Sequence, residues 1–156
     1  AGYMHDIGNV VNRIDHAQSG AVMAFRLLDH IGMEPNEIAL VVSAIGNHDE
    51  STAAAVNPIA AALILADKTD VRRSRVRNPN PASFDIHDRV NYAVESSKTY
   101  FTEDHAAFVL ELSIDTTICP VMDYFEIFLG RMSLCRRAAS FLKIRFELII
   151  NGQQIL

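Results

Sequence analysis

The sequence predicts an α+β protein in which a helical domain comes first and a small strand-helix-strand segment follows. In the first half, apolar residues recur at three- and four-residue steps, which is the periodicity of helices packed on one face. Near the carboxyl end, two stretches alternate apolar and polar residues, as half-buried strands do. Between these halves, residues 78–83 read Asn-Pro-Asn-Pro-Ala-Ser, a linker composition. We therefore expect domains at residues 1–78 and 84–156.

Three helices are expected in the first domain. The first follows Asp15, a residue type that caps helices, and stops at Gly32. The second opens at Pro35, and the third opens with the pair Asn57-Pro58, a cap followed by a proline at the first helical position. The third helix is apolar on every side, so it should lie centrally in the domain.

The second segment should contain two strands that share a sheet with a helix between them. A short helix after Asp85 comes first. The expected elements are then a strand at 108–114, a helix at 120–142 and a strand at 144–150, with an edge strand near 100–102. A helix joining two such strands usually makes them parallel. If the strand edges stay open, they favour pairing between two copies, so a homodimer is expected.

Composition excludes several classes of protein. The chain has 156 residues, 49% of them hydrophobic, and a net charge of -5, which argues against extended nucleic-acid or anionic-membrane surfaces. No apolar run is long enough for a membrane span, and no signal-peptide pattern is present. Cys119 and Cys135 lack metal-binding spacing and should be reduced core thiols. We expect a cytoplasmic protein.

Residues suited to metal binding lie at the ends of the expected helices. They are His5, Asp6, His16, His48 and Asp67. A His-Asp pair alone is more often an exposed polar turn. Imidazoles and carboxylates that project from the ends of packed helices can, however, converge on a shared divalent ion. Five such residues would suffice for two ions.

A basic segment follows Asp67. Lys68 comes directly after it, and four arginines, Arg72, Arg73, Arg75 and Arg77, stand close together in an otherwise acidic chain. Arginine is suited to bidentate contacts with phosphate. A solvated loop explains such a run equally well, so the segment alone leaves both interpretations open.

Four motifs together resemble the HD superfamily of metal-dependent phosphohydrolases. They are Tyr-Met-His-Asp-Ile-Gly-Asn at residues 3–9, His16-Ala-x-x-Gly-Ala, Asn47-His48-Asp49-Glu50 and Leu65-Ala66-Asp67-Lys68-x-Asp70. The resemblance covers residues 3 to about 77 and implies an all-helical HD-type domain. The family's first histidine, on a helix before the His-Asp pair, is not in this sequence. Residues 1–4 accordingly read as the last turn of a helix whose earlier part precedes the sequence.

The resemblance implies which residues carry out the chemistry. One or two divalent ions (Mn, Fe, Mg, Zn or Ni) would be held by the ligands named above, with Asp6 bridging them. Asp6 and Asp67 would then be catalytic. Because Lys68, Arg72 and Arg73 follow Asp67 closely in the sequence, we expect Lys68 to be catalytic as well, and Arg72 and Arg73 to bind substrate phosphate. The implied activity is hydrolysis of a phosphate ester or anhydride in a phosphorylated small molecule such as a nucleotide. The alternative is a non-catalytic HD scaffold that senses nucleotides or binds another protein.

Overall fold

The computed structural model describes residues 1–156, which form two compact units, Ala1–Asp67 and Lys68–Leu156. The first is helical and the second contains a mixed sheet, so the α+β fold class is confirmed. The division falls before the predicted linker at 78–83. Residues on the amino side of that linker bond within the second unit: Arg73 Nε donates to the Tyr92 carbonyl at 2.6 Å, and its guanidinium lies 4.6 Å from the centre of the Tyr92 ring.

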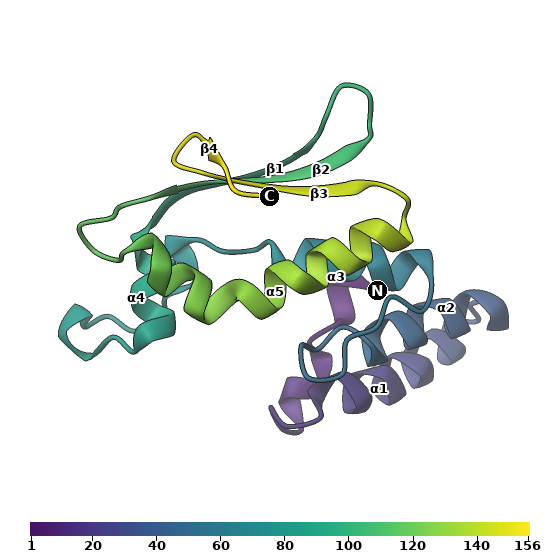
Figure 1. Ribbon diagram of the computed structural model, residues 1–156. Helices are drawn as coiled ribbons and strands as arrows, with labels where there is room; N and C mark the ends of the chain where they lie inside the picture. Colours follow the sequence, from purple (N-terminus) through teal and green to yellow (C-terminus); the bar gives the residue numbers. More distant parts are fainter. The chain divides into compact units, whose positions relative to one another are not determined.

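Three helices build the first unit, as the sequence predicts (Figure 1). They are α1 (His16–His30), α2 (Pro35–Gly46) and α3 (Pro58–Lys68), whose last residue begins the second unit. Two 3-10 turns, Gly2–Met4 and Ile7–Val10, precede α1. His5 and Asp6 lie between these two turns, in the segment that leads into α1.

The helix ends follow the sequence signals with one exception. Gly32 has φ +77°, and its N–H donates to the Asp29 carbonyl at 3.0 Å, a glycine stop of the Schellman type. Asn57 caps α3, since its Oδ1 accepts from the Ala60 N–H at 2.8 Å. Asp15 precedes α1 as expected, but its side chain makes no capping hydrogen bond and its φ is +56°. Asp15 therefore occupies the N-cap position, as predicted, but does not cap the helix through its side chain.

Small residues bring the first unit's backbones close together. A β-carbon on Gly8 would lie 2.0 Å from the His16 carbonyl oxygen and 2.6 Å from the Gly20 nitrogen, so only glycine can occupy this position without a shift. The turn at Ile7–Val10 therefore lies directly against the first turns of α1. This contact fixes the His-Asp pair relative to the start of α1.

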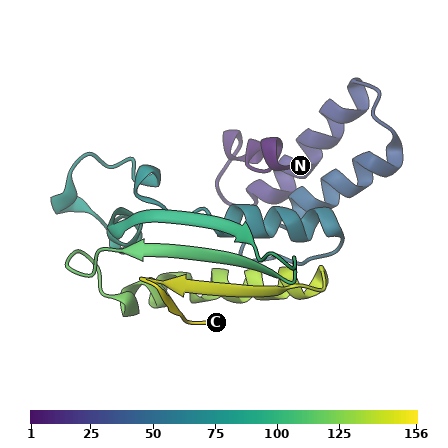
Figure 2. The same cartoon turned by 90° about the horizontal axis from the view of Figure 1, so that it is seen from above.

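The second unit is built on a four-stranded sheet in the order β1-β2-β3-β4. Its strands are β1 (Val94–Phe101), β2 (Ala107–Ile114), β3 (Arg145–Ile150) and β4 (Gln153–Gln154). Figure 2 shows β1 antiparallel to β2, and β3 parallel to β2. The predicted strand-helix-strand arrangement with parallel strands is thus confirmed. The edge strand expected near 100–102 extends much further, back to Val94.

Helix α5 (Val121–Phe141) lies along one face of this sheet (Figure 1). The sheet residues that share this face are mostly buried: Leu110, Leu112, Ile114, Leu148 and Ile150. Helix α4 (Ile86–Ala93) begins after Asp85, whose Oδ1 accepts from the Asp88 N–H at 2.7 Å, as expected of a cap. No helix of the structure combines the length and the apolar character needed to cross a membrane.

Candidate metal centre

Three histidine rings of the first unit are held in the same way. Each has its Nδ1 close to the carbonyl oxygen three residues earlier, at 2.7 Å for His5, 3.0 Å for His16 and 2.6 Å for His48. Because a carbonyl can only accept, Nδ1 is the donor and carries the proton. In the neutral ring, Nε2 then keeps its lone pair, which is the form that binds a metal ion.

The three rings come from different elements. His5 stands between the two 3-10 turns, His16 is the first residue of α1, and His48 follows the end of α2. His16 and His48 are buried. The ring of His48 meets the His5 ring at a centroid distance of 5.0 Å and the His16 ring at 5.2 Å, both edge to face. His48 is therefore the centre of the histidine group.

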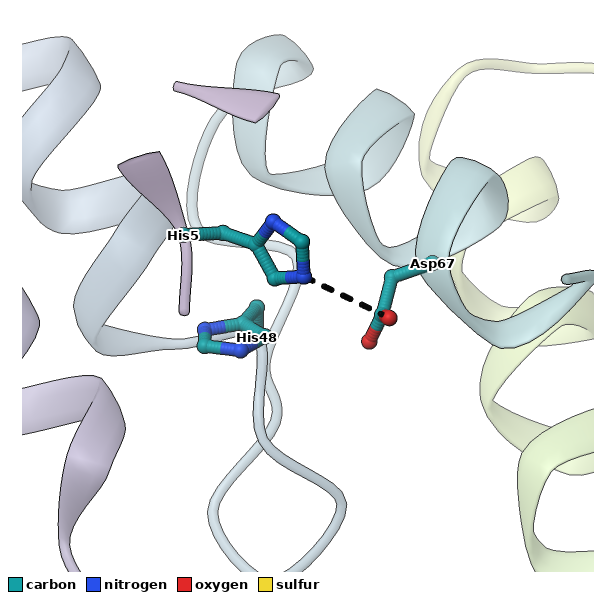
Figure 3. Close-up of side chains that lie close together, drawn as sticks. All are labelled: His5, His48 and Asp67. Atoms are coloured by element: carbon teal, nitrogen blue, oxygen red, sulfur yellow. Dashed lines mark ion pairs between the residues drawn. The ribbon is translucent and has the colours of Figure 1, made fainter. Parts of the chain in front are cut away.

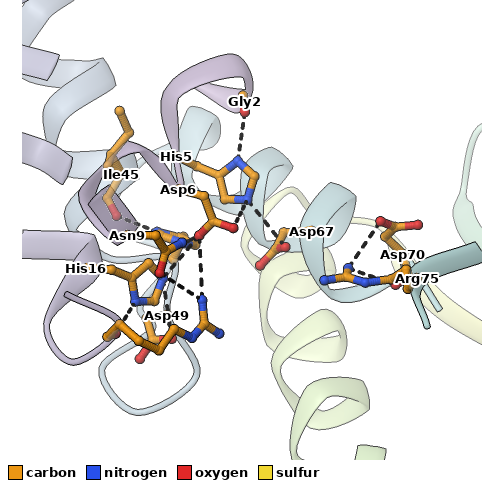
Figure 4. Close-up of polar contacts among 12 residues, drawn as sticks. Gly2, His5, Asp6, Asn9, His16, Ile45, Asp49, Asp67, Asp70 and Arg75 are labelled. Carbon is orange, nitrogen blue, oxygen red and sulfur yellow. Dashed lines mark hydrogen bonds and ion pairs between the residues drawn. The ribbon is translucent and has the colours of Figure 1, made fainter. Parts of the chain in front are cut away.

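Asp6 faces all three histidines, with one oxygen toward one ring and the other oxygen toward two. Its Oδ2 lies 3.7 Å from His5 Nε2. Its Oδ1 lies 3.2 Å from His16 Nε2 and 3.7 Å from His48 Nε2. Figure 4 shows Asp6 beside His5 and His16, with other polar contacts nearby. Asp6 could therefore offer one oxygen beside His5 and the other beside His16 and His48.

Asp67 completes the group from the end of α3, as Figure 3 shows. Its Oδ1 lies 3.6 Å from His5 Nε2. The Asp67 carboxylate raises the pKa of His5; burial opposes this shift, and the Gly2 carbonyl and the Asp6 charge add to it. The field at His5 therefore favours a positive charge.

The separations between ligand atoms fit shared metal coordination. Two atoms that bind one ion at about 2.1 Å in a tetrahedral arrangement lie roughly 3.4 Å apart. The His-Asp pairs span 3.2 to 3.7 Å, whereas hydrogen bonds to nitrogen cluster at about 2.7–3.2 Å. Two triads, His5-His48-Asp67 and Asp6-His16-His48, have all their ligand atoms within 4.8 Å of one another.

Because both triads include His48, and its single Nε2 can serve one ion, two ions would need a different division of ligands. His5 Nε2, Asp67 Oδ1 and Asp6 Oδ2 form one set. His16 Nε2, His48 Nε2 and Asp6 Oδ1 form the other. All five residues predicted as metal ligands from the sequence are thus close together within one unit.

Two residues near the group had no role assigned from the sequence. Asp49 Oδ1 lies 3.9 Å from His16 Nε2, and Asp49 Oδ2 accepts from the Ser51 hydroxyl at 2.6 Å. Arg13 Nη1 lies 4.0 Å from Asp6 Oδ1. Asp49 could have been found as the neighbour of His48 in the chain. No sequence motif marks Arg13, because its closeness to Asp6 depends on how the chain turns before α1.

The predicted phosphate-binding residues belong to the second unit, together with Lys68, which is buried. Arg72 Nε pairs with Asp70 Oδ1 at 2.9 Å, and its side chain is largely exposed. The Arg73 guanidinium is committed to Tyr92, by the carbonyl hydrogen bond and the ring contact described above. Arg73 therefore has a structural role within its unit, whereas Arg72 keeps an accessible side chain.

Comparisons of the chain with protein-family models, with curated proteins and with solved structures gave no match. The case for a function therefore depends on the motifs and on the geometry of the histidine and aspartate group.

Proposed function

We propose that this protein is a metal-dependent phosphohydrolase of the HD type that acts on a phosphorylated small molecule such as a nucleotide. One observation carries the proposal: three histidines, each with Nδ1 bonded to a backbone carbonyl, direct Nε2 toward the carboxylates of Asp6 and Asp67. Such outer hydrogen bonds are the usual means of orienting metal-ligating histidines.

The donor set favours particular ions. Three imidazole nitrogens and two carboxylates suit Fe, Zn, Ni or Mn better than Mg, which prefers oxygen ligands and keeps several waters. Asp6 is about half exposed, so ligand atoms remain accessible beside the buried His16 and His48. This accessibility supports an enzyme, because a purely structural metal site is closed by its side chains.

The reaction adds water across a P–O bond and yields a phosphate and an alcohol or a second phosphate. Bound divalent ions supply Lewis acidity and activate a water at neutral pH. Asp6 and Asp67 would hold the ions together with the three histidines, and their negative charge would favour cation binding there. Lys68 and Arg72, which follow Asp67 closely in the sequence, remain the cations assigned from the sequence to the phosphate oxygens, where charge develops.

Metal analysis and activity measurements on matched variants test the proposal. We expect the purified protein to bind a transition-metal ion and to hydrolyse at least one member of a nucleotide and phosphate-ester panel. Asp6→Asn keeps the size of the side chain but removes its charge, so it should lose metal and turnover while the circular dichroism spectrum stays unchanged. Asp29→Asn, at an exposed position on α1, is the control and should behave as wild type.

A non-catalytic scaffold gives a different pattern. In that case wild type has no turnover on any substrate of the panel, and Asp6→Asn lowers metal content and thermal stability together. That result would contradict the enzyme proposal and favour the sensor or interaction module.

A further inference from the structure

Arg13 brings a guanidinium to the metal-ligand group from within the first unit. Its Nη1 lies 4.0 Å from Asp6 Oδ1, the same oxygen that faces His16 and His48. The same Nη1 donates to Asn9 Oδ1 at 3.3 Å. The side chain is 71% exposed, so its other N–H groups are accessible to a ligand bound beside Asp6.

The backbone of Arg13 is hydrogen-bonded to one of the three histidines. Its carbonyl oxygen accepts from His16 Nδ1 at 3.0 Å, the bond that orients the His16 ring. The next residue, Ile14, donates its N–H to Asn12 Oδ1 at 3.0 Å. The hydrogen bond between the Arg13 carbonyl and His16 Nδ1 therefore fixes the backbone of Arg13 next to His16, a candidate metal ligand.

The first unit has little other positive charge. Among residues 1–67 of the sequence, Arg26 is the other arginine, and there is no lysine. Arg26 lies on α1 ten residues after His16, about 15 Å along the helix at 1.5 Å per residue. Within this unit, Arg13 is thus the cationic side chain that can reach an anion at the group.

We propose that Arg13 binds the phosphate group of the substrate, a role that depends on the proposed phosphohydrolase function. A guanidinium can donate two parallel hydrogen bonds to phosphate oxygens. The competing explanation is that Arg13 is only a counter-ion of Asp6. That contact is long and highly exposed, and exposed ion pairs of this kind contribute little to stability.

Binding of inorganic phosphate to the Mn²⁺-loaded protein tests the assignment without measuring turnover. Isothermal titration calorimetry would compare wild type with Arg13→Ala and Arg13→Lys, and with Arg26→Ala as the matched control. We expect Arg13→Ala to weaken phosphate binding about ten-fold or more, the loss typical of a hydrogen bond to a charged group. Arg13→Lys should be intermediate, Arg26→Ala should match wild type, and Mn²⁺ binding should be the same in all four proteins.

Three other results would overturn the assignment in distinguishable ways. Unchanged phosphate affinity in Arg13→Ala would refute the role of Arg13 and leave the phosphohydrolase proposal standing. A loss of Mn²⁺ in Arg13→Ala would show that the side chain positions Asp6 instead. If Mn²⁺-loaded wild type bound no phosphate, both the role of Arg13 and the proposed function would be wrong.

Discussion

Replacing Gly8 by alanine should disrupt both the first unit and the arrangement of its histidine and aspartate group. The added β-carbon would lie 2.0 Å from the His16 carbonyl oxygen, whereas real β-carbons essentially never come within 3.0 Å of such an atom. The turn at Ile7–Val10 must then move away from α1 by at least about 1 Å. Both obstructing groups are backbone, so the cost should reach the upper end of overpacking penalties, about 3 kcal/mol.

The same displacement has a consequence for metal binding. Asp6 precedes the displaced turn, and its Oδ1 lies 3.2 Å from His16 Nε2 on the helix the turn moves away from. Metal–ligand distances tolerate changes of only about 0.2 Å. We therefore expect Gly8→Ala to weaken divalent-metal affinity by at least ten-fold.

Urea denaturation followed by circular dichroism, together with calorimetric metal titration, would measure both effects. Gly130→Ala is the control, because Gly130 lies within α5 and a β-carbon there meets nothing within 4 Å. It should raise the free energy of unfolding of the second unit by about 0.5–1 kcal/mol through helix propensity. If Gly8→Ala matched wild type in both denaturation midpoint and metal affinity, the close approach of the turn to α1 would be refuted.

Three further perturbations test other parts of the structure. Asp67→Ala should abolish turnover and lower metal content with an unchanged circular dichroism spectrum; unchanged turnover would end its catalytic assignment. Arg73→Ala should lower the free energy of unfolding by about 1–2 kcal/mol in urea denaturation, through loss of its contacts with Tyr92, whereas Arg72→Ala should raise KM without destabilising the protein. Because the pKa of His5 is raised above 6.5 in the metal-free fold, its contribution to stability should be complete below pH 6.5 and lost as pH rises through the raised pKa. An NMR titration of His5 in wild type and Asp67→Asn should show this pKa fall in the variant.

The proximity of His5, Asp6, His16, His48 and Asp67 was predictable because these residues belong to two metal-binding residue types and were expected at helix ends. Proline and glycine signals mark the start of α2 and the end of α1, and those signals proved correct. Asp15 placed His16 at the start of α1, and Gly46-Asn47 placed His48 directly after the end of α2. The strands of the second unit were similarly predictable from alternation, since buried and partly exposed residues alternate along β2 from Leu110 to Ile114.

Other features depend on contacts that periodicity does not encode. The close approach of Gly8 to Gly20 joins the turn and α1 through backbone atoms alone. Asp15 precedes α1 with a positive φ and no capping hydrogen bond from its side chain, which its residue type alone does not indicate. Residues 68–78 looked like part of the helical domain by their position in the sequence, but Arg73 bonds them to α4. Each of these required the three-dimensional arrangement.

The electrostatics of the group link its protonation to its affinity for metal. Asp6, Asp49 and Asp67 all have carboxylate oxygens within 4 Å of a histidine Nε2, in a unit whose sequence contains two arginines and no lysine. Such a concentration of negative charge favours any cation that can reach it. The proton on His5 is one such cation, and the pKa of His5 is raised chiefly by its hydrogen bond to Asp67, with the Gly2 carbonyl and the Asp6 charge adding to the shift. A metal ion bound at Nε2 must displace that proton, so affinity should fall as pH drops below the raised pKa, and binding near that pH should release protons to the buffer.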